Sequence, residues 1–229
     1  MIKPSKTFNH QDRSPIALGL AVIALSLSGC GQGAGSAASS GSAAAPVPAS
    51  AAPPVIATPP TPQPPIPAGW TLYKGTGFTI GVPPGFTPDA THDYQDLGPG
   101  KDIHGVAFTI PAALAKGTNL SSDSYIAVET LPGVPLCVAT PFLSEPESQP
   151  PVIVGRRTYL TATATDAGAG NLHEETVYAL QRSSPCLAVR YFIHSTNIGN
   201  YDPGTIKAFN EKAVLTQFDA IRNTLHVVK

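Results

Sequence analysis

Two strand-like segments joined by a turn occupy residues 172–194, whose sequence is LHEETVYALQRSSPCLAVRYFIH. The first segment has apolar residues at 172, 178 and 180, with Glu174 and Thr176 interrupting that face. The second segment, Leu187–Ile193, is more densely apolar, which is typical of a strand in the centre of a sheet. The Arg-Ser-Ser-Pro at 182–185 is suited to a turn. This region therefore predicts a β-hairpin.

Further strand-like runs precede this hairpin, and one helical pattern follows it. The runs are Thr71–Tyr73, Gly77–Val82, Ile103–Ile110, Ser124–Leu131 and Val152–Thr165. After the hairpin, Asp202 can cap a helix, Pro203 suits its first turn, and an apolar stripe continues from about Gly204 to Leu225. Shorter helices are predicted at Ala112–Lys116 and between Leu136 and Leu143. The expected fold class is α+β, a mainly antiparallel sheet with a long C-terminal helix packed on one face.

The composition limits both the partner and the size of the folded part. The chain has 229 residues, of which only 13% are charged, and a formal net charge of −1. Binding to nucleic acid needs clustered Lys and Arg, which this chain lacks, so no nucleic acid is expected as a partner. The roughly 160 residues from Trp70 onward are enough for one hydrophobic core.

Residues 1–29 have the order of an export signal. Lys3, Lys6 and Arg13 precede an apolar run, Ile16–Leu27, which has signal-peptide length and is too short to span a bilayer as a helix. The run ends in Leu-Ser-Gly-Cys at 27–30, which resembles the lipobox of bacterial lipoproteins at all four positions. That resemblance implies cleavage before Cys30, a diacylglycerol on its thiol and acylation of the new amine. An ordinary secretory signal followed by an accidental cysteine is the alternative.

A lipid on Cys30 would determine where the protein resides. Several acyl chains together attach a protein stably to a membrane, since each buried methylene contributes about 0.8 kcal/mol. In enteric-type lipoproteins an Asp after the lipidated Cys retains the protein in the inner membrane. Gly31 occupies that position here, which favours the outer membrane. We therefore expect a protein of the bacterial cell envelope whose first partner is the membrane itself.

Residues 30–69 have the composition of a disordered linker. No charged residue occurs between Arg13 and Lys74, and the second half of the linker has ten prolines between Pro46 and Pro67. Large apolar side chains are too few to offset the entropy of ordering the backbone. The expected organisation is therefore a lipoprotein signal peptide at 1–29, a lipidated Cys with its linker at 30–69, and a single domain at 70–229.

Two short phrases in the expected domain are similar to PsbP-like domains. Gly-Phe-Thr-Ile at 77–80 followed by Pro-Pro-Gly-Phe at 83–86 resembles the opening of that fold, and residues 218–225, FDAIRNTL, resemble its terminal helix. Members of that fold are mostly binding or assembly proteins without a catalytic motif. The resemblance therefore implies a binding module.

Cys137 and Cys186 remain as a pair once Cys30 is assigned to the lipid. In an oxidising compartment such a pair is expected to form a disulfide. The bridge would close a loop of about 50 residues and would stabilise the fold by about 4 kcal/mol in the chain-entropy model. Two buried free thiols are the alternative, and nothing marks either cysteine as catalytic.

Four groups of polar residues are candidates for chemistry, although none fits a known catalytic, metal or nucleotide motif. The first group could hold a metal or supply acid–base partners: His92, Asp93, Tyr94, Asp96, Asp102 and His104. The second, His173-Glu174-Glu175, has the pattern of a polar strand edge because its carboxylates point to opposite faces. The third follows the last strand and comprises His194, Ser195, Asn197, Asn200 and Asp202. The fourth is a set of arginines, Arg156, Arg157, Arg182 and Arg190, whose ordinary role is to pair with carboxylates.

The third group is the preferred binding candidate, with His194, Asn197, Asn200 and Asp202 as its residues, because polar loops near the start of a helix are good ligand positions. His194, Ser195 and Asp202 are also the residue types of a hydrolytic triad. Neighbours on a strand point to opposite faces, however, so His194 cannot easily reach Ser195. No catalytic residue, metal or cofactor is predicted.

These observations favour a non-catalytic envelope lipoprotein whose domain binds a protein or glycan partner. One alternative is an envelope hydrolase that uses His194 or the group around His92 and His104. Another is a structural spacer for envelope integrity, in which the length of the linker is the functional property.

Overall fold

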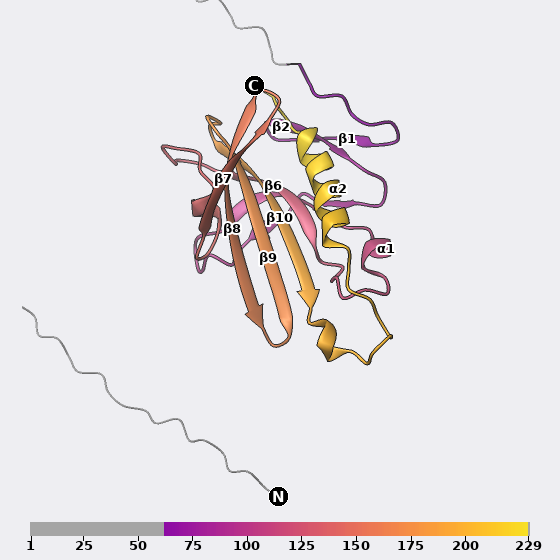
Figure 1. Cartoon of the computed structure of the whole chain (residues 1–229). Coiled ribbons are helices and arrows are strands. Elements are labelled where there is room, and N and C mark those ends of the chain that lie inside the picture. The colour runs from indigo at the N-terminus through magenta and orange to yellow at the C-terminus, as the bar shows by residue number, and fades with distance from the viewer. Residues whose placement is uncertain (1–61, 229) are drawn as a thin grey trace, which may run out of the picture. The chain divides into compact units, whose positions relative to one another are not determined.

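The computed structural model describes residues 62–228, so the predicted signal peptide, Cys30 and most of the linker lie outside the described residues. The described part is mostly antiparallel sheet with one helix of more than a single turn (Figure 1). The predicted antiparallel sheet and C-terminal helix are confirmed. The α+β class overstated the helical part, because the fold is dominated by sheet. Residues 62–67 are neither helix nor strand and lead into a turn at Ala68-Gly69.

An eight-stranded antiparallel sheet forms most of the described region, with the order β3-β5-β6-β10-β9-β8-β7 and with β4 paired to β5. Its strands are β3 (Thr87–Asp89), β4 (Asp93–Tyr94), β5 (Ile103–Thr109), β6 (Tyr125–Leu131), β7 (Glu147–Val154), β8 (Arg157–Gly168), β9 (Asn171–Leu180) and β10 (Cys186–Thr196). β10 lies between β6 and β9, so the apolar run at 187–193 belongs to a central strand, as predicted. The turn at 182–185 joins β9 to β10, which confirms the predicted hairpin.

The prediction of one continuous strand over Val152–Thr165 is wrong. β7 ends at Val154 and β8 begins at Arg157, and these two residues pair with each other across a tight turn. Gly155, with a φ of 58°, supplies the left-handed conformation that the turn requires. Apolar residues on both sides of the turn made the two strands look like one in the sequence.

The C-terminal helix, α2, spans Glu211–Asn223 and is shorter than predicted. Its N-cap is Asn210, whose side chain accepts a hydrogen bond from the Ala213 amide, and not Asp202. The cause lies in the preceding segment, where the backbone of Lys207 exchanges hydrogen bonds with the loop at 117–119 and cannot make helical ones. Of the two shorter predictions, Ala112–Lys116 appears as α1 (Ala112–Ala115), and the segment between 136 and 143 contains a 3₁₀ turn, Thr140–Phe142.

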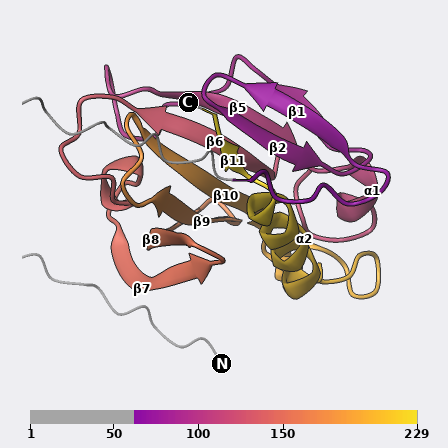
Figure 2. The same ribbon diagram turned by 90° about the horizontal axis from the view of Figure 1, so that it is seen from above.

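The large sheet has an apolar core on each face. On the helix face, α2 and the odd-numbered residues of β10 share a cluster that includes Leu187, Val189, Tyr191, Ile193, Val214, Phe218, Ile221 and Leu225. A small sheet with the order β1-β2-β11 adjoins this core: β1 (Thr71–Gly75), β2 (Phe78–Val82) and β11 (His226–Val227). Figure 2 shows α2 on one side of the large sheet, next to the hairpin of β1 and β2.

Arg222 fastens the end of α2 to the helix face. It is only 4% exposed, and its guanidinium lies 4.0 Å from the Tyr178 ring centroid and 5.7 Å from those of Tyr159 and Tyr191. Asp219, one turn earlier, binds Nη2 at 3.0 Å. Nε and Nη1 have no hydrogen-bond partner among the described residues, so the aromatic faces provide the remaining stabilisation of the charge.

We call the opposite side of the sheet the loop face, because the segment at 137–143 covers one end of it. Its core includes Cys137, Ala139, Phe142, Leu143, Cys186 and Ala188. The predicted disulfide between Cys137 and Cys186 is confirmed, with their Cα atoms 4.9 Å apart. The bridge ties the covering segment to the first residue of β10. The other end of the loop face, toward His194, is only half-buried.

Candidate functional site

Side chains from all four predicted polar groups meet on the loop face. They are His92 and Tyr94 from the first group, His173 and Glu175 from the second, His194 from the third and Arg190 from the fourth. The register explains this meeting, because β10 lies between β6 and β9. His194 is directly opposite His173 on β9, and Phe192 is opposite both Glu175 on β9 and Tyr125 on β6.

Arg190 is the centre of a buried charge network. Its side chain and that of Glu129 are both 0% exposed, and Nε and Nη2 bind the two oxygens of Glu129 at 2.8 and 3.0 Å. Nη1 pairs with Glu175, and Nη2 also donates to the Phe142 carbonyl at 2.6 Å. The guanidinium carbon lies 3.4 Å from the centroid of the Tyr94 ring. Burial of a charge is tolerated only with such partners.

The network shifts the pKa values of its two carboxylates in opposite directions. Burial opposes ionisation of Glu129 and is the largest single influence, but the Arg190 charge and the hydrogen bonds from His92 and Arg190 together outweigh it and lower the pKa of Glu129. For Glu175 burial predominates and raises the pKa, although Arg190 and the Tyr94 hydroxyl act in the other direction. Burial likewise raises the pKa of Tyr94. Of the two carboxylates, Glu175 is therefore the one that takes up a proton first as the pH falls.

Gly105 makes room for this network on β5. It pairs with Glu129 on β6, and a Cβ at that position would lie 2.6 Å from the Val128 carbonyl oxygen and 2.9 Å from Glu129 Cγ. Any side chain there would displace the Glu129 carboxylate. The Gly105 amide also donates to the His92 carbonyl at 3.0 Å, which holds the imidazole Nε2 3.3 Å from Glu129 Oε1.

Five rings continue from the network toward the half-buried end of the loop face. Their centroids are 4.9 Å apart for His92 and Tyr125, 4.8 Å for Tyr125 and Phe192, 5.6 Å for Phe192 and His173, and 4.4 Å for His173 and His194. Each of the five residues is half-buried. We call this row the ring strip. Rings at these separations stabilise one another, so the strip is a preformed surface.

The His194 end of the ring strip is polar. His194 Nδ1 lies 2.9 Å from both carboxylate oxygens of Asp123, and Nε2 lies 3.1 Å from Asn171 Oδ1. Burial opposes the charge on Asp123, but hydrogen bonds from Ser121 and His194 outweigh it and lower the pKa of Asp123. This carboxylate is therefore an anionic hydrogen-bond acceptor at the exposed end of the strip.

The other predicted binding residues make local hydrogen bonds in the loop that follows β10. Asn197 accepts a hydrogen bond from the Gly199 amide at the start of a 3₁₀ turn, Ile198–Asn200. The Asn200 side chain donates to the Gly170 carbonyl at 3.4 Å. The Asp202 carbonyl accepts from Thr205 in a turn. These three residues thus take part in hydrogen bonds that shape the backbone of the loop that follows β10.

Other members of the predicted groups are also separated from the strip. His104 is exposed and pairs with Asp93, and it alternates on β5 with the buried Ile103 of the loop-face core, so it points the other way. Ser195, next to His194, is 4% exposed and belongs to the helix face. Sequence reasoning did not single out Glu129, although a charged residue inside the apolar run at 125–131 was a usable signal.

No protein-family model matches this chain, and the search of curated proteins found no match. Within residues 62–228, no helix is long and apolar enough to cross a bilayer. The same part of the chain holds no group of three or more His, Cys, Asp or Glu placed to bind a metal ion.

Proposed function

We propose that the chain is a lipid-anchored protein of the bacterial envelope whose domain binds an extended protein or glycan surface through the ring strip. The single observation that carries the proposal is the ring strip itself: five half-buried rings in contact, ending in the His194–Asp123 pair. Aromatic side chains with adjacent polar groups are favoured at binding surfaces because one side chain supplies both apolar area and hydrogen bonding. The outer membrane is the proposed location, on the basis of the lipobox and Gly31.

The geometry of the charge network supports binding over catalysis. Glu129 is wholly buried and both of its oxygens contact Arg190, so it cannot reach a substrate. Glu175 is occupied by Arg190 and Tyr94. These carboxylates therefore serve to fix the strands beneath the strip. The resemblance of residues 77–86 and 218–225 to PsbP-like domains points to the same kind of role.

The hydrolase alternative has one observation in its favour, the contact of His194 with Asp123. A triad of the serine-hydrolase type would also need a nucleophile at the other ring nitrogen. Here that nitrogen contacts Asn171, and Ser195 is buried on the helix face. The pair is therefore better suited to recognition than to activating a nucleophile.

Replacing Cys30 tests the anchor. The Cys30→Ala variant has no thiol to lipidate, so we expect it to leave the membrane fraction and appear in the soluble envelope fraction. The measurement is fractionation of cells with detection of a tag after Lys229. Ser36→Ala is the control, because it changes a nearby residue of the linker but leaves the lipobox and the disulfide intact. A Cys30→Ala protein that still sediments with membranes would contradict the anchor.

Replacing strip histidines tests the binding surface. We expect a His173→Ala/His194→Ala variant to lose most of any partner captured by chemical crosslinking in intact cells, a decrease of about fivefold or more for a hot-spot change. His104→Ala is the matched control, since His104 forms a similar His–Asp pair on the other side of β5. Undiminished crosslinking by the double variant would rule the strip out as the binding surface.

Shortening the linker separates the spacer alternative. If the length of residues 31–69 were the functional property, deletion of half of these residues would impair envelope integrity. The partner would still be captured by crosslinking. The binding proposal requires instead that envelope integrity is impaired only when binding of the partner is lost.

A further inference from the structure

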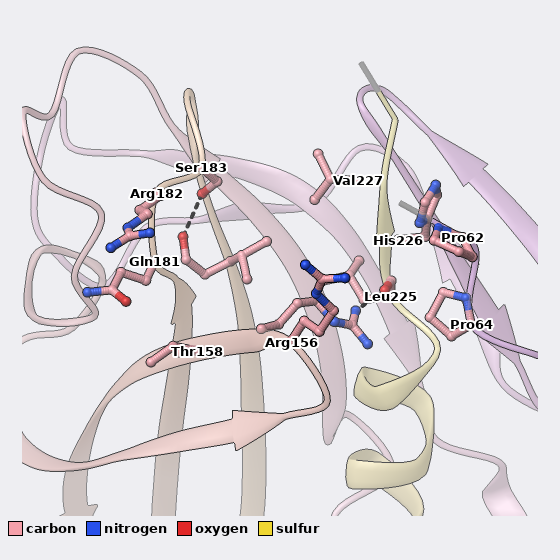
Figure 3. Close-up of a pocket in the computed structure, with 12 residues that line it drawn as sticks. Pro62, Pro64, Arg156, Thr158, Gln181, Arg182, Ser183, Leu225, His226 and Val227 are labelled. Atoms are coloured by element: carbon pink, nitrogen blue, oxygen red, sulfur yellow. Dashed lines mark hydrogen bonds between the residues drawn. The ribbon is translucent and has the colours of Figure 1, made fainter. Parts of the chain in front are cut away.

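A cavity of about 320 Å³ lies where the described end of the linker meets the domain. It shares no residue with the ring strip. In Figure 3, Arg182 lies on the turn between β9 and β10 at one side of the cavity, and Pro62, Pro64 and His226 lie at the other. This volume is at the lower end of the range for small-molecule sites.

The rim of the cavity carries unneutralised positive charge. Arg156, Arg157 and Arg182 line it together with His226, whereas no Asp or Glu is among the described residues that line it. None of the three arginines forms an ion pair with another residue of the 62–228 region. Clustered cations without counter-charges repel one another, and binding of an anion relieves that repulsion.

The three arginines do not have the same role. Arg157 is already engaged, because it donates to the carbonyls of Asn223, at 2.9 Å, and Leu225, and so caps the end of α2. Arg156 and Arg182 are exposed and make no side-chain hydrogen bond within the described chain. These two guanidinium groups are therefore available to a ligand.

Apolar residues form part of the remaining wall, together with Thr158, Gln181 and Ser183. Leu180 and Leu225 are buried, Val227 is 38% exposed, and the two prolines face them from the linker side. A simple inorganic anion would leave this apolar surface unused. A ligand that combines an anionic group with an apolar part would contact both kinds of wall.

We propose that this cavity binds a phosphate-bearing amphiphile, with the phosphate held by Arg156, the Arg182 charge adding to the attraction from the rim, and the apolar part against Leu180 and Val227. Guanidinium groups match phosphate oxygens in charge and in planar hydrogen-bond geometry, which favours phosphate over a singly charged head. A phospholipid or a soluble phosphate ester could supply this chemistry. The site does not depend on the ring strip or on its partner.

Calorimetric titration of the full chain in a neutral, phosphate-free detergent tests the proposal. The probes are dihexanoyl phosphatidic acid, glycerol 3-phosphate, inorganic phosphate and dihexanoyl phosphatidylcholine. We expect the phosphatidic acid to bind about tenfold or more tightly than the two phosphates that lack an acyl chain, because they cannot use the apolar wall. We also expect it to bind about tenfold more tightly than the zwitterionic lipid, whose head is neutral overall.

The controls use variants that should fold normally. Arg156→Gln/Arg182→Gln should weaken binding of the phosphatidic acid by about tenfold or more. Val227→Ser should weaken binding of the phosphatidic acid while leaving the binding of inorganic phosphate unchanged. Lys101→Gln/Lys212→Gln removes the same charge from exposed positions outside the cavity and should have no effect. Equal binding of lipid and inorganic phosphate, equal binding by the arginine variant, or no binding by any probe would each overturn the proposal.

Discussion

An Arg190→Met variant loses about 3–5 kcal/mol of the free energy of unfolding, the cost expected when one partner of a buried ion pair is removed. The Glu129 carboxylate then stays buried without its counter-charge, and the Phe142 carbonyl loses its donor. The measurement is urea denaturation at neutral pH. The wild type and the variant are compared with the same dependence of the free energy of unfolding on urea concentration. Since a domain of this size has about 5–15 kcal/mol in total, the loss is close to unfolding it.

A double variant distinguishes an unpaired charge from simple loss of packing. Glu129→Leu/Arg190→Met removes both charges, and apolar replacement of a whole buried ion pair is often nearly neutral, so it should recover most of the loss. Arg156→Met is the matched control on an exposed arginine and should change stability by no more than about 0.5 kcal/mol. Stability of Arg190→Met within about 1 kcal/mol of wild type would show that the network does not hold the sheet.

The pH dependence of the same variants is a second readout. Folding lowers the pKa of Glu129, so its contribution to stability is complete above its ordinary value of 4.5 and is lost as the pH falls through the lowered value. Glu175 acts oppositely, because folding raises its pKa and its contribution is lost as the pH rises. The acid loss is therefore best measured in a Glu175→Gln background, and it should disappear in Glu129→Leu/Arg190→Met.

The sequence patterns predicted those elements that local interactions determine, such as the central strand and the hairpin. The apolar density of Leu187–Ile193 indicated a central strand, and the turn at 182–185 indicated the hairpin. The start of α2 was not predictable in this way, because the backbone of Lys207 bonds to a loop about 90 residues earlier in the chain. A cap and a proline at 202–203 are compatible with a helix, but they do not compete with hydrogen bonds that only the tertiary fold supplies.

The candidate site was predictable only in its parts. His173, His194 and Arg190 were each visible as polar residues on strands, but their meeting depends on the register of β9, β10 and β6. Nothing in the sequence placed Glu129 beside Arg190, because the two are 61 residues apart. The general signal was present nonetheless: a charged residue inside each of two apolar strands predicts a partner for both, since neither can be buried alone.

Removal of the disulfide has the second of the two large effects. A Cys137→Ala/Cys186→Ala variant is expected to lose about 4 kcal/mol of the free energy of unfolding in the chain-entropy model, because the unfolded chain is no longer closed into a loop. The bridge spans 49 residues of sequence, from the segment that covers the loop face to the start of β10. Urea denaturation of the oxidised wild type, the reduced wild type and the variant measures the loss.

The disulfide and the charge network act on the same segment, which makes their coupling testable. Phe142, five residues after Cys137, gives its carbonyl to Arg190, so the bridge and the arginine both hold the cover of the loop face. Once the bridge is gone, Arg190→Met should cost less than in the intact protein, with a coupling of about 0.5–3 kcal/mol. Cys30→Ala, which removes a cysteine outside the bridge, should leave stability and coupling unchanged. Strictly additive losses would mean that the cover is held by its apolar contacts alone, with Phe142, Ala139 and Leu143 as the residues to replace next.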